Sequence, residues 1–331
     1  MGVLAVNGIH PGKVLLVGEA MTLFGAREEG DLAEVRDFIA STAGAELNVA
    51  VGLRRLGQQP MYMTRLGLDP FGERILGFMR NNDLDTSMVG RDEFRPTGIM
   101  FKSKVEHGDP VTFYRRAGSA ASALSPIDIQ SIDWQVVSVL HMTGILPPLS
   151  DSTFQASCAL VRVAHQHGIF VSFDPNLRPA LWPDTDTMRA TLRELASQAD
   201  LVMPGLTEGH ELFGVDTPES VARAFLDNGA KTVVVKDGPR GALAANKKSS
   251  RYVPGFVVDH VVDTVGCGDG FAAGVLSALL EGQDLSAATE RGCALGAIQT
   301  QHESDNEALP TSNELEMFIT SHRRALYKEK M

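Results

Sequence analysis

The sequence predicts an α/β fold in which helices cover both faces of a mainly parallel sheet and a small antiparallel β sheet forms a lid. Short apolar runs alternate along most of the chain with amphipathic stretches of roughly 10–15 residues, which is the pattern of strand–helix crossover units. With 44% hydrophobic and 21% charged residues, the 331-residue chain can bury a sizeable core. Two stretches, 19–46 and 97–118, break the alternation and are the source of the predicted lid.

The elements of the main sheet follow from the apolar runs taken in chain order. Expected strands are residues 14–18, 61–67, 136–143, 169–174, 201–204 and 232–236. Expected helices are residues 48–57, 71–82, 151–167, 184–198, 218–228 and 271–281. Gly57 ends the first of these helices and Asn82 ends the second, because both residue types favour helix ends.

The two irregular stretches point to a separate small sheet. Residues 19–46 follow the first strand without a long helical pattern, and residues 97–118 read as two strands joined by the turn-rich segment 107–110 (HGDP). Together they would form an antiparallel lid over a site at the carboxyl ends of the parallel strands. A surface hairpin with no role is the alternative. Length alone allows two units or one large domain with an insert.

Charge and composition exclude several functional classes. The formal net charge of −11 disfavours a nucleic-acid binder, and an acidic ligand would need positive charge gathered locally. The apolar runs are far shorter than the ~20 residues that cross a bilayer, and the first residues lack a cationic leader, so we expect a cytoplasmic protein without a membrane partner. Cys158, Cys267 and Cys293 share no metal-ligand spacing and the histidines form no cluster, so we expect reduced thiols and no metal site built from them.

The strongest chemical signal is the glycine-rich segment 263–274, DTVGCGDGFAAG. Gly266, Cys267 and Gly268 precede a helix-compatible stretch, so their backbone N–H groups can converge on an anion at a helix N-terminus. The carboxylate of Asp269 would repel a phosphate, and we therefore interpret it as a base that takes a proton from a hydroxyl attacking the bound phosphoryl group. A glycine-rich loop with an acidic helix cap is the alternative interpretation.

This segment resembles the C-terminal signature of the PfkB, or ribokinase-like, carbohydrate kinases, in which D-T-x-G-A-G-D precedes a helix. Residues 43–57, AGAELNVAVGLRRLG, resemble the N-terminal signature of the same family. The two signatures occur in the family's order, and the resemblance covers roughly residues 13–310. It implies a single ribokinase-like kinase domain with a β lid, which would use ATP and Mg²⁺ to phosphorylate a sugar hydroxyl.

Within that family the sequence is most similar to the 2-keto-3-deoxygluconate kinases. Residues 113–124, FYRRAGSAASAL, resemble their lid strand and the segment after it. Residues 173–178, FDPNLR, resemble a strand end that supplies an arginine to the substrate, a motif that fructokinases share. The resemblance implies phosphorylation of the terminal C6 hydroxyl of 2-keto-3-deoxy-D-gluconate. Another sugar kinase, of the fructokinase or ribokinase type, and the galactonate epimer as substrate remain open.

A sugar acid fits the cations of these two motifs. A guanidinium can bind a carboxylate through two parallel hydrogen bonds, and motif position favours Arg115 and Arg178 for this contact, with Arg116 third. An exposed lid rim is the alternative for the two adjacent arginines. By resemblance Gly44 lets the backbone approach the sugar and Asn48 hydrogen-bonds to it, although Asn48 also suits a plain helix start.

The nucleotide is expected beside residues 232–241, TVVVKDGPRG, which resemble the family segment that passes the ATP phosphates and ribose. Lys236, Gly238 and Gly241 are the candidate contacts, and a solvated strand end is the alternative for the lysine. Cys293 stands about where many relatives place an asparagine near the adenosine, so no residue is assigned to that end of the nucleotide.

The resemblance also concerns two ions. Glu208 would act through water on Mg²⁺, although Gly205 stands where the family's Asn-x-x-Glu motif has asparagine. Asp263 and the backbone near Val265 lie where some members hold a monovalent cation such as K⁺, and the sequence leaves that cation open.

The expected partners are therefore a sugar acid and ATP, and a homodimer or higher homo-oligomer is an option because lids in this family often pair. Two other classes fit the sequence less well. A dinucleotide-dependent oxidoreductase would need a glycine-rich turn after the first strand, where this chain has EAMTLFG. A non-enzymatic sugar-acid sensor would have no need of Asp269 as a base.

Overall fold

The computed structural model describes residues 4, 6, 8–105, 110–302, 305–322 and 324. Its body is a nine-stranded sheet in the order β13-β12-β11-β10-β9-β8-β1-β4-β5, parallel from β11 to β5 and antiparallel at the β11-β12-β13 end. The prediction of a mainly parallel α/β sheet is confirmed. The strands are β1 Lys13–Val17, β4 Pro60–Gly67, β5 Val89–Asp92, β8 Val137–Thr143, β9 Phe170–Asp174, β10 Leu201–Val202, β11 Thr232–Lys236, β12 Gly241–Asn246 and β13 Ser250–Pro254.

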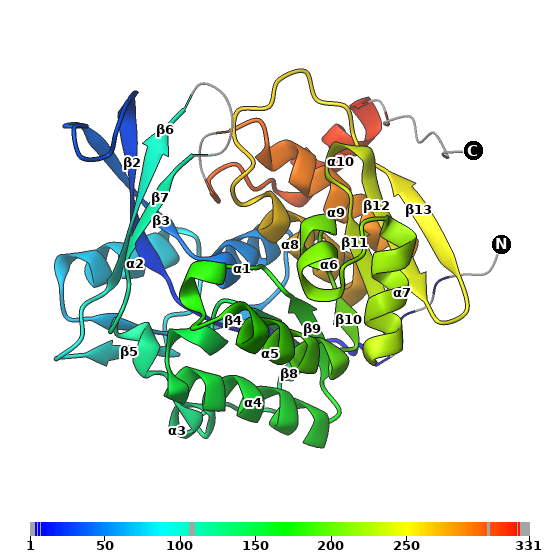
Figure 1. The fold of residues 1–331 in the computed structure, drawn as a ribbon, viewed down its shortest axis with the longest axis horizontal. Helices are drawn as coiled ribbons and strands as arrows, with labels where there is room; N and C mark the ends of the chain where they lie inside the picture. The colour runs from blue at the N-terminus through cyan, green and yellow to red at the C-terminus, as the bar shows by residue number, and fades with distance from the viewer. Residues whose placement is uncertain are drawn as a thin grey trace.

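Helices cover both faces of this sheet (Figure 1). Side-chain alternation in β1 separates the two layers: Val14 and Leu16 pack with α1, α2, α8, α9 and α10, whereas Leu15 and Val17 pack with α3 to α7. No helix among the described residues is long and apolar enough to cross a bilayer. The helices are α1 Ala45–Arg55, α2 Pro70–Asn81, α3 Pro126–Ile129, α4 Asp151–Gln166, α5 Thr185–Ser197, α6 Leu206–Phe213, α7 Pro218–Asn228, α8 Cys267–Leu280, α9 Leu285–Gln299 and α10 Ser312–Ser321.

All the predicted strands and helices are present, with ends that shift by at most four residues. The largest shifts are at α1 and α8, which begin before the predicted Asn48 and Phe271. The prediction omits β5, α3, α6, α9, α10 and the β12–β13 pair. Helix α9 is buried around most of its circumference, so its sequence lacks the alternation of apolar and polar faces that marks a surface helix.

A second sheet stands off the body, at the upper left of Figure 1, and forms the lid. Its order is β3-β2-β6-β7, and its outer pairs are antiparallel. The middle pair, β2 with β6, is parallel and joins the two inserts. Of the predicted turn, residues 107–109 lie outside the described part of the chain. The lid strands are β2 Met21–Glu29, β3 Phe38–Ala43, β6 Gly98–Lys104 and β7 Thr112–Arg115.

The two faces of the lid differ in character. Met100 and Tyr114 belong to a small apolar cluster on one face. Phe24, Phe101 and Phe113 form an aromatic row on the other, with ring centroids of Phe24 and Phe101 5.3 Å apart and those of Phe101 and Phe113 6.4 Å apart. Because side chains alternate along a strand, each residue of β6 and β7 can be assigned to one of these faces.

Helices α1 and α8 cross at close range, which brings the two signature segments together. A Cβ atom at Gly52 would lie only 2.7 Å from the Cβ atom of Ala273. Glycine in α1 therefore sets the distance at which α1 packs on α8. The first turns of the two helices carry Asn48 and Asp269, so this distance also governs the site.

We expect Gly52→Val to lower the free energy of unfolding by about 1–3 kcal/mol, because the added atoms overpack the contact between the helices. The matched control is Gly77→Ala in α2, where a Cβ atom would meet nothing within 4 Å. That variant should gain up to about 1 kcal/mol from helix propensity. Urea unfolding of both variants measures the difference, and an unchanged midpoint for Gly52→Val would contradict the proposed crossing.

Candidate active site

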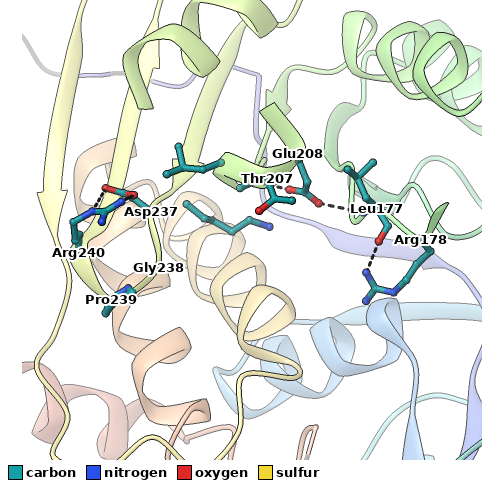
Figure 2. Close-up of a pocket in the computed structure, with 11 residues that line it drawn as sticks. Leu177, Arg178, Thr207, Glu208, Asp237, Gly238, Pro239 and Arg240 are labelled. Carbon is teal, nitrogen blue, oxygen red and sulfur yellow. Dashed lines mark hydrogen bonds and ion pairs between the residues drawn. The ribbon is translucent and has the colours of Figure 1, made fainter. Parts of the chain in front are cut away.

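The candidate site lies at the carboxyl ends of the parallel strands, on the side of the body that carries the lid. A cavity of about 580 Å³ opens there between the segments 177–178, 205–208 and 236–240, which follow β9, begin α6 and follow β11 (Figure 2). Arg178 lies at one end of this cavity and Arg240 at the other, where Arg240 is paired with the buried Asp237. Carboxyl ends of parallel strands are the usual binding edge of such sheets.

The predicted anion hole is the beginning of α8. Gly266 caps the helix with φ of 78°, and a Cβ atom there would lie 2.5 Å from the carbonyl oxygen of Asp305, so glycine is required. Cys267 and Gly268 follow in the first turn, where backbone N–H groups have no acceptor within the helix. Burial raises the pKa of the Cys267 thiol to about 12, so this side chain stays neutral beside the hole.

Asp269 lies in the first turn of α8 and accepts a 2.8 Å hydrogen bond from the side-chain amide of Asn48. Asn48 in turn accepts a 2.8 Å bond from Asn306, which also donates to the carbonyl oxygen of Thr42 at 2.9 Å. Burial raises the pKa of Asp269 to about 7, and the bond from Asn48 opposes part of that rise. A carboxyl group with this pKa can take up and release a proton near neutral pH.

Lys236 ends β11 and directs its ammonium group toward the same helix start. Its Nζ lies 2.6 Å from Oδ2 of Asp174, and a Cβ atom on Gly268 would be 3.7 Å from that nitrogen. Burial lowers the pKa of Lys236, but Asp174 and Glu208 outweigh it and raise the pKa above the ordinary value. The structure therefore places a fixed positive charge beside the predicted anion hole.

Glu208 is held in the first turn of α6 by backbone donors. Its carboxylate accepts hydrogen bonds from the N–H of Gly205 and, at 3.2 Å, from the N–H of Leu177. Burial raises the pKa of Glu208, while the nearby Lys236 lowers it and Asp174 raises it further. Glu208 and Asp174 thus border one lysine.

These two carboxylates fit a magnesium ion of the kind that retains water. No group of three or more His, Cys, Asp or Glu side chains able to hold a metal occurs in the described ranges. Mg²⁺ in phosphoryl-transfer sites keeps several waters and takes one or two carboxylates together with phosphate oxygens. Glu208 and Asp174 supply two carboxylates, so the ion needs no further protein ligands.

Two of the candidate arginines, Arg178 and Arg116, have different settings. Arg178 is exposed at the end of the cavity and donates a 2.8 Å hydrogen bond to the carbonyl of Leu177. Arg116 is buried and forms a 2.5 Å ion pair with Glu19, whose second oxygen accepts a hydrogen bond from Ser119. Arg116 is therefore a desolvated guanidinium held by a carboxylate under the lid.

Arg115 does not join this group. It ends β7 two residues after Phe113, so it lies on the aromatic face of the lid and is exposed. The opposite face carries Lys102, which reaches Asp263 in the loop before α8. The face of the lid that contacts the loop before α8 is therefore the face that Arg115 does not share, whereas Arg116 is buried just after β7 with Glu19.

The three predicted glycines have different settings. Gly44 caps α1 with φ of 151°, and a Cβ atom there would lie 2.6 Å from the carbonyl oxygen of Glu19. Gly238 lines the cavity with φ of 58°. Gly241 instead supports the β12–β13 pair, since a Cβ atom there would lie 2.1 Å from the carbonyl oxygen of Val253. Of these three glycines, Gly238 is the one that lines the cavity, and its positive φ belongs to the turn after β11.

The sequence-based interpretation missed several residues of the site. Glu46 is buried, accepts a 2.5 Å hydrogen bond from Thr143, has its pKa raised to about 6 by burial, and has one oxygen without a partner among the described residues. Asp174 lies within the FDPNLR segment, so that motif could have indicated it. No local pattern marks Asn306 or Lys102, which meet their partners 258 and 161 residues away in the sequence.

Comparison with known proteins agrees with this arrangement. The family model described as "pfkB family carbohydrate kinase" matches residues 12–312. The 2-dehydro-3-deoxygluconokinase of Bacillus subtilis is 42% identical over 313 residues, which cover 94% of this chain and 97% of that protein. The match therefore spans both the body and the lid.

Two solved structures share the fold. A PfkB protein from Polaromonas sp. JS666 is 42% identical, with a TM-score of 0.83, and the match covers 92% of this chain and 99% of that one. A double mutant of the Vibrio cholerae O395 fructokinase, solved with fructose, ADP and potassium ion, is 27% identical with a TM-score of 0.84 over 94% of this chain and 99% of that one.

The raised pKa of Asp269 makes stability depend on pH. The folded state holds this proton more tightly than the unfolded chain, so the side chain is neutral and well tolerated below about pH 4 and lowers stability as the pH rises through about 7. We expect Asp269→Asn to be more stable than the parent by about 2–4 kcal/mol at pH 8, with the difference vanishing near pH 4. Urea unfolding across this range tests it, with exposed Asp227→Asn as control; a difference independent of pH would contradict it.

Proposed function

The chain belongs to the PfkB family of carbohydrate kinases, and from that premise we propose that it transfers the γ-phosphoryl group of ATP to the C6 hydroxyl of 2-keto-3-deoxy-D-gluconate. The observation that carries the proposal is the placement of Asp269. A carboxyl group of pKa about 7 lies at a helix N-terminus, between a lysine and an asparagine, where a phosphoryl group and a hydroxyl can both reach it.

Asp269 acts as the general base. It takes the proton of the C6 hydroxyl as that oxygen forms its bond to the γ-phosphorus, and the bond from the γ-phosphorus to the bridging oxygen of ADP breaks in line. The hydrogen bond from Asn48 fixes the side chain so that one carboxylate oxygen remains for the hydroxyl. A pKa near the working pH suits a group that must be ionised before the transfer and protonated after it.

The beginning of α8 stabilises the charge that develops on the transferred group. Backbone N–H groups of Gly266, Cys267 and Gly268 and the positive end of the helix dipole act on the equatorial oxygens. Lys236, which lies beside Gly268, adds a full charge. Because these donors are fixed by the backbone and by an ion pair, little reorganisation is needed during the reaction.

The cavity of about 580 Å³ takes the nucleotide, with Lys236 and Gly238 along its phosphates and ribose. Gly241 does not contact the nucleotide in this proposal. It allows the turn that contains Gly238 to pack closely against β13. Mg²⁺, when bound, neutralises the phosphate charge and shields the entering oxygen. Glu208 and Asp174 would hold that ion, and the backbone hydrogen bonds to Glu208 keep its carboxylate oriented.

The carboxylate of the sugar acid is bound by arginine. We assign this role to Arg178, at the end of the cavity, and to Arg116, which is buried with Glu19 beside the lid, so Arg116 replaces Arg115 in this proposal. Gly44 shapes the loop beside the sugar, and Asn48 contacts its hydroxyls as well as Asp269. Closure of the lid excludes water, which would otherwise accept the phosphoryl group.

A fructokinase is the second candidate, since the DPNxR motif is shared and the Vibrio cholerae relative was solved with fructose. The arginines distinguish the two, because only a sugar acid offers a carboxylate to their guanidinium groups. We also propose a cytoplasmic location and a homodimer that pairs the aromatic faces of the two lids, on which Phe113 and Val111 are exposed.

Asp269→Asn should bind ATP normally and lose on the order of 10²–10⁴ in kcat, the usual contribution of one acid–base group. The parent enzyme should lose activity about tenfold per pH unit below pH 7, because protonated Asp269 cannot act as a base. The residual rate of the variant should not show this decrease. Steady-state kinetics from pH 5.5 to 8.5 measure both. Asp227→Asn should match the parent, and near-parental turnover by Asp269→Asn would remove the base from the mechanism.

Release of ADP with a panel of 2-keto-3-deoxygluconate, its galactonate epimer, fructose and ribose tests the substrate. We expect the deoxy-keto acids to have the highest kcat/KM. Arg178→Ala and Arg116→Ala should each raise KM for the acid by about 10- to 100-fold, the loss of one charge-assisted contact, and spare neutral sugars. Exposed Arg162→Ala is the matched control. Preference of the parent for fructose would overturn the substrate assignment.

A further inference from the structure

Lys102 is a buried lysine on the lid, and the proposed reaction does not use it. It lies in β6, two residues after Met100, and therefore on the face of the lid that turns toward the body. Its side chain is only 9% exposed. A lysine is almost never buried to that extent unless its charge is paired.

The partners of Lys102 lie on two separate segments of the body. Its ammonium group contacts Oδ2 of Asp263 and lies 3.5 Å from Oδ1 of Asp305. The side chains of these aspartates are 11% and 5% exposed. Burial raises the pKa of Asp305, with Lys102 acting against that rise and Asp263 in favour of it. One ammonium group therefore holds together two buried carboxylates that would otherwise repel each other.

Both aspartates shape the turn that begins α8. The second oxygen of Asp263 accepts a 3.0 Å hydrogen bond from the N–H of Val265. The backbone of Asp305 packs so closely on Gly266 that a Cβ atom there would lie 2.5 Å from its carbonyl oxygen. Gly266 is the cap of α8, immediately before the N–H groups assigned to the phosphoryl oxygens. The lid is thus linked to the anion hole through a single side chain and its two partners.

The sequence left open whether a free monovalent cation binds near Asp263 and Val265. The residues present do not fit a second cation there, because the ammonium group of Lys102 already lies against Asp263 and near Asp305. A tethered ammonium has the same charge as potassium and is held at high local concentration by the chain. The Vibrio cholerae relative, in contrast, was solved with a potassium ion.

We propose that Lys102 is a positioning residue that supplies a built-in cation to the turn before α8, so that closure of the lid orders the anion hole and activity needs no free monovalent cation. The proposal rests on the proposed kinase function. It makes the lid an active part of the phosphate site: the same movement that covers the sugar delivers the charge on which the Gly266 turn depends. With the lid open, Asp263 and Asp305 lack that charge and the turn loosens.

The first test uses the parent enzyme with ATP, Mg²⁺ and the preferred sugar acid, in choline or potassium chloride at equal ionic strength. We expect kcat and the melting temperature to change by less than twofold and less than 1 °C, respectively, on exchange of choline for potassium. Activation of the parent more than fivefold by potassium would overturn the proposal. If the parent phosphorylates no sugar or sugar acid under either condition, the proposed function fails instead, and the two failures are thereby distinguished.

The second test removes the cation. Lys102→Ala in choline chloride should lose at least tenfold in kcat with KM for the sugar acid changed less than threefold, because the anion hole and not the sugar contact is disturbed. Potassium, ammonium or ethylammonium should restore much of the lost kcat and raise the melting temperature of this variant. Charge-keeping Lys102→Arg should retain activity, and Lys104→Met, which removes a charge from the exposed end of the same strand, should behave as the parent in either salt.

A third variant relieves the repulsion in another way. Lys102→Met combined with Asp305→Asn leaves one buried carboxylate instead of two, so it should recover part of the activity lost by Lys102→Met alone and respond less to potassium. Unchanged kcat in Lys102→Ala, or a loss that no cation restores in a variant that melts as the parent does, would overturn the proposal. Thermal melting in both salts, measured without substrates, reports cation binding independently of activity.

Discussion

The hydrogen bond from Asn48 to Asp269 is the contact on which the site depends. It joins helices α1 and α8 across 221 residues of sequence, and it can form only because Gly52 lets the two helices cross closely. The bond orients the carboxylate at the helix start, and it limits the rise in pKa that burial causes. This one contact therefore fixes the position of the carboxylate and moderates a basicity that burial sets, and the hydrogen bond from Asn306 holds Asn48 in place.

A chain with a net charge of −11 has to gather positive potential where its ligands bind. Its buried cations are each held by a carboxylate, as Lys236 is by Asp174, Arg116 by Glu19 and Lys102 by Asp263. These pairs hold the cations in place before any ligand arrives. An entering phosphate or carboxylate then competes with a protein carboxylate rather than with bulk water, which favours ligands that bring two or more charged oxygens to the site.

Much of the fold could be predicted from the sequence, because buried parallel strands are continuous apolar runs and most of the surface helices are amphipathic. Helix α9 was not predicted, because it is buried on most sides and its sequence therefore lacks a polar face. The C-terminal signature segment pointed to Asp269 and the segment 232–241 pointed to Lys236. The choice between Arg115 and Arg116, in contrast, depends on which face of the lid each side chain joins, a property that changes with a single residue. Lys102 and Asn306 could not be found, because their partners are distant in sequence and no local pattern records such a contact.

The pairing of the lid strands determines how the lid can move. Met21 pairs with Ala43 and with Gly98, and Ile99 pairs with Arg115, so all four strands enter or leave the body at the same edge of the small sheet. The four connections between lid and body lie in one row and therefore form a hinge line. Rotation about that line needs dihedral changes only near the four crossings, whereas sliding would have to displace all four segments at once. Rotation is therefore the favoured movement, and it carries the far edge of the sheet furthest.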